Sequence, residues 1–209
     1  MNTEIKIVYI DDISDEQISQ YLDEIYSKEP LIFQENQNVN IIKHTLEVPF
    51  THNYKETLND VRVKSANVIL VDNHLFEEQA SDGGKFSGKQ FKIILRKILP
   101  FVEVLIITQD TSLKGENIIY KYPGGNIPET YTDYYNRNLA PALDKAIQEN
   151  CYYQELAEEL QQNTEIERFL IEKVLQSVHG DDSYDDLSKQ DIDVLIQNFN
   201  ELKEKLTHE

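Results

Sequence analysis

Cysteine, tryptophan and long apolar runs are scarce or missing in this sequence of 209 residues. Cys151 is the single cysteine, so no disulfide can form within the chain, as expected of a protein in a reducing compartment. No apolar run approaches the roughly 18 residues that a membrane-spanning helix needs. The N-terminal stretch also lacks the basic region and cleavage site of a secretory signal. We therefore expect a cytoplasmic protein that does not engage a membrane.

Positive charge is also scarce, with 20 Lys and Arg against 38 Asp and Glu and a formal net charge of −18. Residues 151–209 alone hold 15 acidic and 5 basic side chains. Binding to a phosphate backbone depends on Lys and Arg displacing condensed cations, so we expect no nucleic-acid partner. The histidines show no zinc-site spacing; they are His44, His52, His74, His179 and His208.

Five short apolar runs, rich in β-branched residues, indicate strands. Their continuous apolar character is typical of parallel strands buried on both faces. Alternation with helical patterns predicts a doubly wound α/β domain with a five-stranded parallel sheet, in the flavodoxin-like order 2-1-3-4-5. The predicted strands are 5–10, 41–48, 67–71, 102–107 and 118–120, and the predicted helices are 14–26, 54–64, 87–98, 138–161, 165–178 and 188–206.

Helix signals divide the chain into a domain over residues 1–150 and an all-α extension over 151–209. Ser14 and Gln17 form a capping-box pattern that predicts the start of the first helix. The acidic run at 181–186 is interpreted as a linker. The apolar stripe of the last helix, 192–206, either packs within a helical bundle or forms a partner-binding face.

Carboxylates stand where two of the predicted strands end. Asp11 and Asp12 follow the first strand, and Asp72 follows the third. Ligands of open parallel sheets bind at the carboxyl ends of the strands, and these two strands are neighbours in a flavodoxin-like order. Clustered carboxylates resist ionisation unless a cation lies among them, and oxygen-only ligands favour Mg²⁺ over Ca²⁺ when the protein supplies few of them. One carboxylate could then attack phosphorus.

Two further polar residues end later strands. Thr108 ends the fourth and could donate its hydroxyl to a phosphoryl oxygen, while Lys121 ends the fifth and supplies positive charge. Together with the three carboxylates, these residues resemble the response-regulator receiver (CheY-like) family over about residues 4–150. The resemblance implies that Asp72 accepts a phosphoryl group and that Asp11, Asp12, Asp72 and the backbone carbonyl of His74 hold Mg²⁺. It further implies that Thr108 acts as the switch residue and that Lys121 pairs with the phosphoryl group.

The same resemblance implies a place in two-component signalling. The phosphoryl donor would be a sensor histidine kinase or a phosphotransfer protein in a phosphorelay. The protein would be no enzyme beyond slow self-dephosphorylation. Because the tail is so acidic, we expect output through protein contacts of the C-terminal helices with an unknown downstream protein, or through a homodimer that these helices form.

Two departures from the family pattern keep alternatives open. The segment 109–117 is too short for a usual helical crossover, so the helix after the fourth strand is expected to be missing or reduced to a turn. Tyr122 separates Lys121 from Pro123, whereas proline follows the lysine directly in the family. One alternative is therefore a degenerate receiver that acts as a phosphorylation-independent interaction module. Another is a Mg²⁺-dependent phosphatase that uses the same carboxylates.

Two other motifs are set aside. Residues 83–90 nearly match a nucleotide-binding loop, but Gln90 stands where a hydroxyl should reach Mg²⁺, and no strand precedes the loop directly. The tyrosine-rich segment 130–135 could stack on bases, but with so acidic a surface we expect its tyrosines to pack the preceding loop.

Overall fold

The structure is a computed structural model that describes residues 2–31, 40–50, 54–75, 87–115, 117–125, 128–162 and 168–178. The predicted linker 181–186 and the predicted helix 188–206 lie outside these residues. So does the part of the glycine-rich segment that precedes Ser87.

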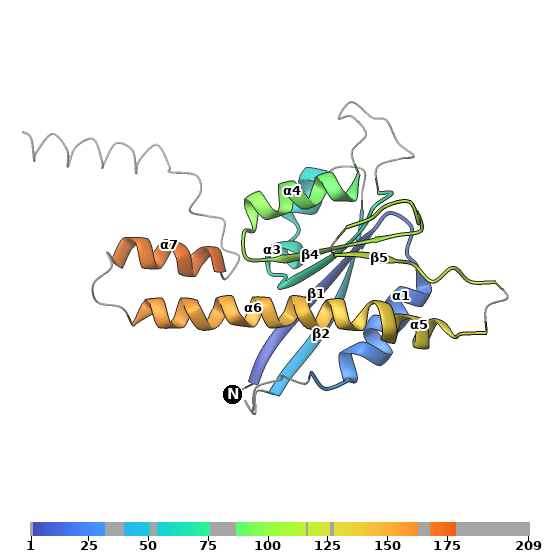
Figure 1. The fold of residues 1–209 in the computed structure, drawn as a ribbon. Coiled ribbons are helices and arrows are strands. Elements are labelled where there is room, and N and C mark those ends of the chain that lie inside the picture. The colour runs from blue at the N-terminus through green and yellow to red at the C-terminus, as the bar shows by residue number, and fades with distance from the viewer. Residues whose placement is uncertain are drawn as a thin grey trace, which may run out of the picture.

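The core of the molecule is one parallel five-stranded sheet in the order β2-β1-β3-β4-β5 (Figure 1), which confirms the predicted fold. All four strand pairings are parallel, so the carboxyl ends of the strands meet at one edge. The strand bounds are β1 Asn2–Asp11, β2 Asn40–Pro49, β3 Val68–Asp72, β4 Glu103–Thr108 and β5 Ile118–Tyr120.

Helices cover both faces of the sheet. One face carries the segment from α1 to η2 together with α5 and α6; the other carries α2, α3 and α4. The bounds are α1 Glu16–Gln20, π-helical η1 Tyr21–Ile25, 3₁₀-helical η2 Tyr26–Lys28, α2 Tyr54–Asn59, α3 Val61–Lys64, α4 Gly88–Ile98, α5 Tyr131–Asn138, α6 Ala140–Gln161 and α7 Arg168–Val178.

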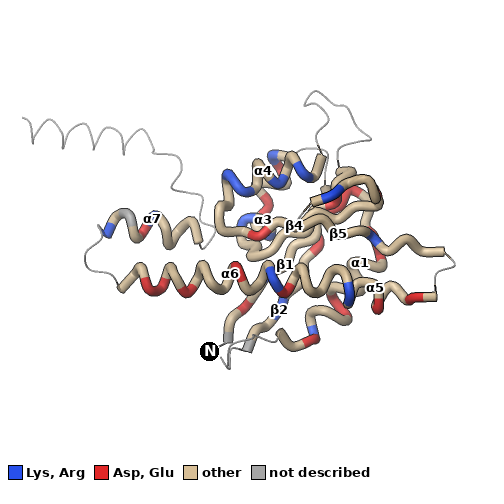
Figure 2. Tube along the Cα trace, viewed as in Figure 1, with Lys and Arg blue, Asp and Glu red and all other residues tan. Residues whose placement is uncertain are grey.

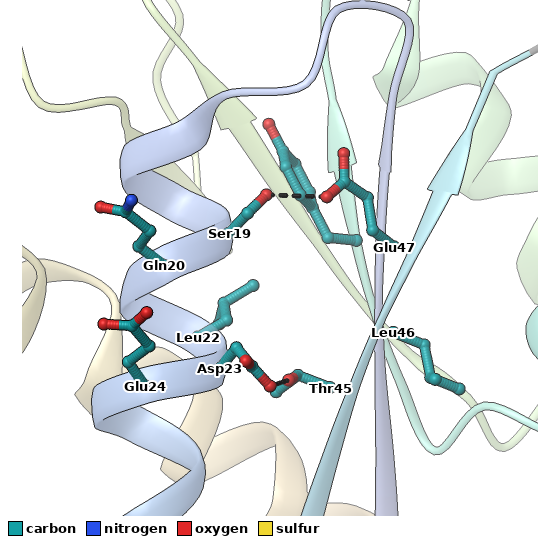
Figure 3. A pocket seen from close by; sticks show the side chains of 9 residues that line it. Ser19, Gln20, Leu22, Asp23, Glu24, Thr45, Leu46 and Glu47 are labelled. Atoms are coloured by element: carbon teal, nitrogen blue, oxygen red, sulfur yellow. Dashed lines mark hydrogen bonds between the residues drawn. The ribbon is translucent and has the colours of Figure 1, made fainter.

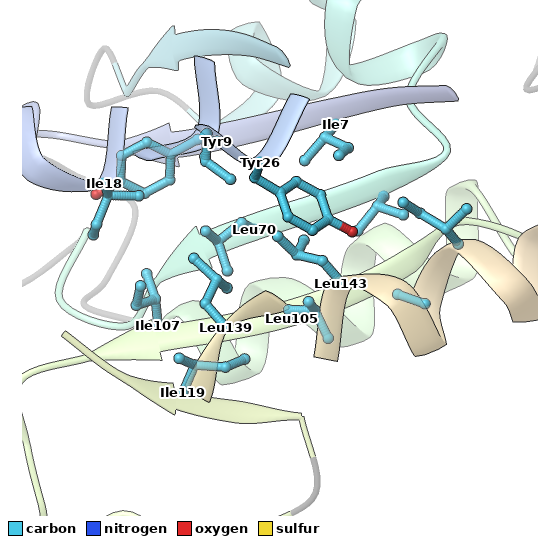
Figure 4. Packing of buried hydrophobic residues seen from close by; sticks show 14 of the residues in the cluster. Ile7, Tyr9, Ile18, Tyr26, Leu70, Leu105, Ile107, Ile119, Leu139 and Leu143 are labelled. Atoms are coloured by element: carbon cyan, nitrogen blue, oxygen red, sulfur yellow. The ribbon is translucent and has the colours of Figure 1, made fainter. Parts of the chain in front are cut away.

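Strand β1 shows why the strand sequences read as unbroken apolar runs. Ile7 and Tyr9 point into the cluster beneath α1, α5 and α6, while Val8 and Ile10 point into the cluster beneath α3 and α4. Successive side chains of a strand alternate between faces, so a strand covered on both sides needs apolar residues at every position. Figure 4 shows Tyr9 within the first of these clusters.

The first helix begins one residue later than the capping-box pattern predicts. Asp15, not Ser14, is the N-cap: its side chain accepts hydrogen bonds from the backbone N–H groups of Gln17 and Ile18. An Asp and a Ser cap helices about equally well, so local sequence does not decide between neighbouring candidates. The predicted helix 14–26 is also not uniform, because its second half is the π turn η1 followed by η2.

A cluster of tyrosines explains how the π turn is held. Tyr21 and Tyr26 are five residues apart, which matches the i→i+5 hydrogen bond that the N–H of Tyr26 donates to the carbonyl of Tyr21. Both rings are buried and stack at 6.4 Å. Their hydroxyls donate to Asn136 at 2.7 Å and to Asp144 at 2.6 Å, which ties this segment to α5 and α6.

The segments before and after β5 agree with the predictions made for them, and the second also forms a helix that was not predicted. Residues 109–115 and 117 form turns and no helix, as the shortness of this segment predicts. The tyrosine-rich segment packs against the preceding loop, as predicted: the hydroxyl of Tyr135 accepts a hydrogen bond from the N–H of Tyr122 at 3.0 Å, and the rings of Tyr122 and Tyr134 lie 5.6 Å apart. It also forms a helix, α5, that the sequence analysis did not predict; Thr130 caps this helix through the N–H of Asp133, and Tyr135 is fully buried.

The C-terminal part of the described chain is a helical hairpin. Helix α6 runs without a break through residue 150, where the sequence places the boundary between domain and extension, and α7 packs against it. Pro141 lies in the first turn of α6, where a missing N–H costs nothing. Figure 2 shows acidic residues spread along α6. Within the described residues, no helix is both long and apolar enough to cross a bilayer.

Candidate functional site

Two neighbouring strands bring the predicted carboxylates together. Pairing of Ile10 with Val71 places the ends of β1 and β3 side by side, so Asp11 and Asp72 lie next to each other. Both are 3% exposed, and Asp12 at the mouth of the site is half-buried. Oxygen atoms of Asp11, Asp12 and Asp72 all lie within 4.8 Å of one another. The structure thus gathers the three acidic residues that the strand ends indicate.

Lys121 reaches the same cluster from beyond the end of β5. Its Nζ lies 3.0 Å from Oδ2 of Asp11 and 3.1 Å from Oδ1 of Asp72. The backbone fixes the position of the lysine, because its N–H donates to the carbonyl of Thr108 at 2.8 Å. The tyrosine between Lys121 and Pro123 therefore does not keep the lysine away from the carboxylates.

Tyr9 is a member of the site that the sequence reasoning missed. Its ring is 1% exposed, and its hydroxyl donates to Oδ2 of Asp11, the oxygen that Lys121 also contacts. Residues two apart on a strand point to the same face, so the spacing of Tyr9 and Asp11 was the available signal. Burial and the charge of Asp11 raise the pKa of the Tyr9 hydroxyl above its usual value, which keeps it a donor.

The site carries more negative than positive charge. Three carboxylates lie together, and among the described residues one ammonium group, that of Lys121, contacts two of them, Asp11 and Asp72. Burial raises the pKa of Asp72, and Asp11 adds to this effect, against the opposing influence of Lys121. Burial and the neighbouring Asp11 likewise raise the pKa of Asp12. The pKa of Lys121 is also raised: burial would lower it, but Asp72 and Asp11 together outweigh burial.

A cavity of about 460 Å³ opens over these groups. His74 is part of its wall, and the backbone N–H of His74 donates to Oδ2 of Asp72 at 2.8 Å. Thr108 is fully buried, does not line this cavity, and accepts a hydrogen bond on its hydroxyl from the N–H of Asp110 at 3.1 Å. The lining residues are Asp11, Asp12, Ile13, Ser14, Asp15, Asp72, His74, Gln109 and Lys121.

Gly88 positions the backbone of the site, which the sequence did not reveal. A Cβ at this position would lie 2.3 Å from the carbonyl oxygen of Asp72 and 2.9 Å from Cα of Asn73. Only glycine lets the first turn of α4 approach the end of β3 so closely. The N–H of Gly88 donates to the carbonyl of Asn73 at 3.0 Å, which fixes this contact.

The donor set fits a hard divalent cation. All candidate ligands are carboxylate oxygens, which suit Mg²⁺. Oδ1 of Asp72 is buried and makes no hydrogen bond; its contact with Nζ of Lys121 is an ion pair without hydrogen-bond alignment. Asp11, Asp12 and Asp72 would hold the ion, with the predicted carbonyl of His74. The ion would supply positive charge that offsets the excess of carboxylates and the charge of an incoming anion.

Removal of divalent cations is expected to destabilise the protein. A ligand that binds only the folded state stabilises it in proportion to the logarithm of its concentration above Kd. We expect the melting temperature to rise with MgCl₂ in the millimolar range and to fall again with EDTA. In Asp12→Asn, which keeps the shape of the side chain and removes one charge, the rise should be smaller. An equal rise with KCl at matched ionic strength would contradict a specific site.

Fold and site together define a flavodoxin-like α/β domain with an acidic cavity at the carboxyl edge of its sheet. No family model matches the chain, and no curated protein matches its sequence. Solved structures give weak similarities. One is a two component transcriptional regulator AraC from Clostridium phytofermentans, with a TM-score of 0.41 and 15% identity over 73% of this chain and 98% of that chain.

Two further similarities are to structures of the response regulator RcsB. One is a complex of RcsB with DNA, with a TM-score of 0.35 and 11% identity over 85% of this chain and 93% of that chain. The other is RcsB of Salmonella typhimurium, with a TM-score of 0.34 and 13% identity over 86% and 93%. Similarities of this size carry no conclusion about what this chain does, so its function has to be inferred from the site.

Proposed function

We propose that this protein is a response regulator of two-component signalling that accepts a phosphoryl group on Asp72. The observation that carries the proposal is the grouping of Asp72 with Asp11, Asp12 and Lys121 in an open cavity at the carboxyl edge of the sheet. Carboxylates beside one another and beside an ammonium group suit a reaction that brings a phosphoryl group next to a nucleophilic oxygen.

The hydrogen bonds favour Asp72 over Asp11 as the nucleophile. Oδ2 of Asp11 is held by both the hydroxyl of Tyr9 and Nζ of Lys121. Oδ1 of Asp72, by contrast, has no hydrogen-bond partner, while its Oδ2 is oriented by the N–H of His74. Asp72 is thus oriented on one oxygen and has a lone pair available on the other.

The phosphoryl transfer forms one bond and breaks one. An oxygen of Asp72 forms a bond to phosphorus while the P–N bond of a phosphohistidine donor breaks, and that bonding pair leaves with the imidazole nitrogen. The product on this chain is an acyl phosphate. Lys121 stays beside Asp72 and offsets the added negative charge. The donor would be a sensor histidine kinase or a phosphotransfer protein, and no other catalytic activity than slow self-dephosphorylation is proposed.

Output is proposed to run through protein contacts of residues 151–209 in the cytoplasm. This part of the chain holds 15 acidic and 5 basic residues, which disfavours contact with nucleic acid. Thr108 is the proposed switch, and for this role its hydroxyl has to leave the N–H of Asp110 and turn toward the phosphoryl group.

The test is phosphorylation by a small donor. With MgCl₂ and acetyl phosphate, we expect the intact mass to rise by one phosphoryl group, and hydroxylamine should remove it as it does other acyl phosphates. Asp72→Asn should show no increase, because an amide is not nucleophilic toward phosphorus. Asp133→Asn, the same change at an exposed residue of α5, should be labelled like the wild type. Equal labelling of Asp72→Asn would contradict the proposal.

A second candidate is a phosphorylation-independent interaction module. Two observations favour it: Thr108 is turned away from the cavity, and residues 109–115 and 117 form no helix that could relay a change. It predicts that the wild type takes up no label from acetyl phosphate. The phosphatase alternative instead predicts turnover of p-nitrophenyl phosphate that depends on Mg²⁺ and on Asp72.

A further inference from the structure

A second cavity, of about 330 Å³, lies between the first helical segment and the edge strand β2. Figure 3 shows that Ser19, Leu22 and Asp23 of the helical segment face Thr45 and Glu47 of β2. This volume is in the range of small-molecule sites. Its lining residues are Tyr9, Ser19, Gln20, Leu22, Asp23, Glu24, Thr45, Leu46 and Glu47.

The lining is amphipathic and negatively charged. Asp23, Glu24 and Glu47 supply carboxylates, and among the residues that the structure describes no Lys, Arg or His lines the cavity. The hydroxyl of Ser19 donates to Glu47 at 2.9 Å, and Thr45 donates to Asp23 at 3.3 Å. Neither bond neutralises a charge. A cationic ligand could therefore pair with these carboxylates, while the ring of Tyr9 and the side chain of Leu22 would contact its apolar part.

The nearest lysine along β2 does not compensate this charge. Lys43 precedes Thr45 by two residues and points to the same face of the strand. Its Nζ, however, lies 3.7 Å from the ring centroid of Tyr26, and the charges that act on it are those of Asp144 and Glu29. Lys43 is thus engaged beside the cavity and not within it.

The π turn shapes one wall of the cavity. Leu22, Asp23 and Glu24 belong to η1, whose wider turn is closed by the hydrogen bond from Tyr26 to Tyr21. π turns inserted in α-helices occur frequently at functional sites. The buried rings of Tyr21 and Tyr26 hold these three residues in the π-helical geometry, which is otherwise less favourable than that of an α-helix.

Tyr9 connects this cavity with the phosphoacceptor site. It lines the cavity, and its hydroxyl donates to Oδ2 of Asp11. Tyr9 therefore joins the cavity between η1 and β2 to Asp11, which lines the acidic cavity at the sheet edge. A ligand that moves Tyr9 changes the hydrogen bonding of Asp11.

We propose that the cavity between η1 and β2 binds a small organic cation, an ammonium group attached to a short apolar group, and that Tyr9 links its occupancy to Asp11. The proposal that the cavity binds this cation rests on the cavity and its lining, and not on the proposed function. The link to Asp11 rests on the proposed function as a phosphoacceptor.

Three small aromatic probes of similar size and different charge test the charge of the ligand. The full chain, labelled with ¹⁵N, is titrated with benzylamine, benzyl alcohol and benzoate at constant ionic strength. Benzylamine should shift the amide signals of Ser19, Leu22 and Thr45 in a saturable way. Benzyl alcohol should bind at least threefold more weakly, and benzoate should leave these signals unchanged. Shifts that do not saturate, or equal affinity for the three probes, would overturn the proposal.

A matched pair of variants tests the role of the carboxylate. Glu47→Gln keeps the acceptor for Ser19 and removes one charge, so the Kd of benzylamine should rise about threefold, as expected of a partly exposed ion pair. Glu158→Gln removes the same charge from an exposed position of α6 and should leave the Kd unchanged. An unchanged Kd in Glu47→Gln would also overturn the proposal.

The link through Tyr9 is tested with the phosphoryl mimic beryllofluoride and Mg²⁺. Coupling between two sites is reciprocal, so the Kd of benzylamine should differ at least twofold between the metal-free protein and the beryllofluoride complex. Tyr9→Phe keeps the ring and loses the hydroxyl, and should abolish this difference. If beryllofluoride forms its complex and the Kd does not change, the link is wrong. If beryllofluoride does not bind at all, the proposed function fails instead.

Discussion

Replacing Lys121 with methionine is expected to lower the free energy of unfolding of the metal-free protein by about 3 kcal/mol, the cost of breaking a buried ion pair. The ammonium group lies 3.0 Å from Asp11 and 3.1 Å from Asp72, and the lysine side chain is 9% exposed. Without it, two buried carboxylates face each other, and the main remaining partner of Asp11 is the hydroxyl of Tyr9. Methionine keeps most of the apolar stem, so the loss reports on the charge.

Urea denaturation with and without Mg²⁺ measures this effect. Because a divalent cation among the carboxylates takes over the neutralising role of the ammonium group, Mg²⁺ should stabilise Lys121→Met more than the wild type. Lys97→Met makes the same change at an exposed position of α4 and should stay within about 0.5 kcal/mol of the wild type. If the two variants were equally stable without metal, Lys121 would not be the counter-charge of this site.

The strands can be predicted from the sequence because burial on both faces leaves a strong signal, whereas their order was expected from the flavodoxin-like pattern. A run such as Val68–Val71 must be apolar at every position, and the polar residue that ends it then stands out. That is why Asp11, Asp72 and Lys121 could be selected before the structure was known. The geometry places their side-chain atoms in contact, while the chemical roles of these residues remain predictions.

The residues that the sequence analysis missed owe their roles to close contacts that form only in the folded chain. In the sequence, Tyr9 cannot be distinguished from other buried aromatic residues, and only the structure shows its hydroxyl beside Asp11. Gly88 looks like any glycine at the start of the predicted helix 87–98, and only the structure shows that a Cβ there would lie 2.3 Å from the carbonyl oxygen of Asp72. Helix α5 is likewise missing from the predicted elements: its sequence is mostly polar, and only the buried ring of Tyr135 accounts for its position against the core.

The two cavities indicate which ligands the protein could bind more specifically than its net charge does. Both lie beside β1 and are lined by carboxylates. Among the described residues, Lys121 and His74 line the acidic cavity at the sheet edge, whereas no Lys, Arg or His lines the cavity between η1 and β2. A cation is expected in each: a hard metal ion where three carboxylate oxygens converge, and a larger organic cation where carboxylates lie beside Leu22 and Tyr9. Tyr9 is the side chain through which one could influence the other.

Gly88→Ala is expected to lower the free energy of unfolding by about 2–3 kcal/mol, the usual cost of forcing a methyl group into a packed site. The new Cβ would meet backbone atoms only, at 2.3 Å from the carbonyl oxygen of Asp72, and backbone cannot turn aside as a flexible side chain can. Either α4 moves outward or the end of β3 moves. In both cases the hydrogen bond from Gly88 to Asn73 is strained and Asp72 is displaced.

The displacement gives this variant a second, functional signature. Misplacing a reacting group by a fraction of an ångström slows a reaction strongly, so labelling by acetyl phosphate should be about tenfold slower in Gly88→Ala. Gly124→Ala is the matched control: its φ of +66° strains an alanine, but no atom lies within 4 Å of the added Cβ. It should cost about 1 kcal/mol and leave the labelling rate unchanged. Slower labelling in both variants would show that loss of stability, and not the close approach at Asp72, causes the effect.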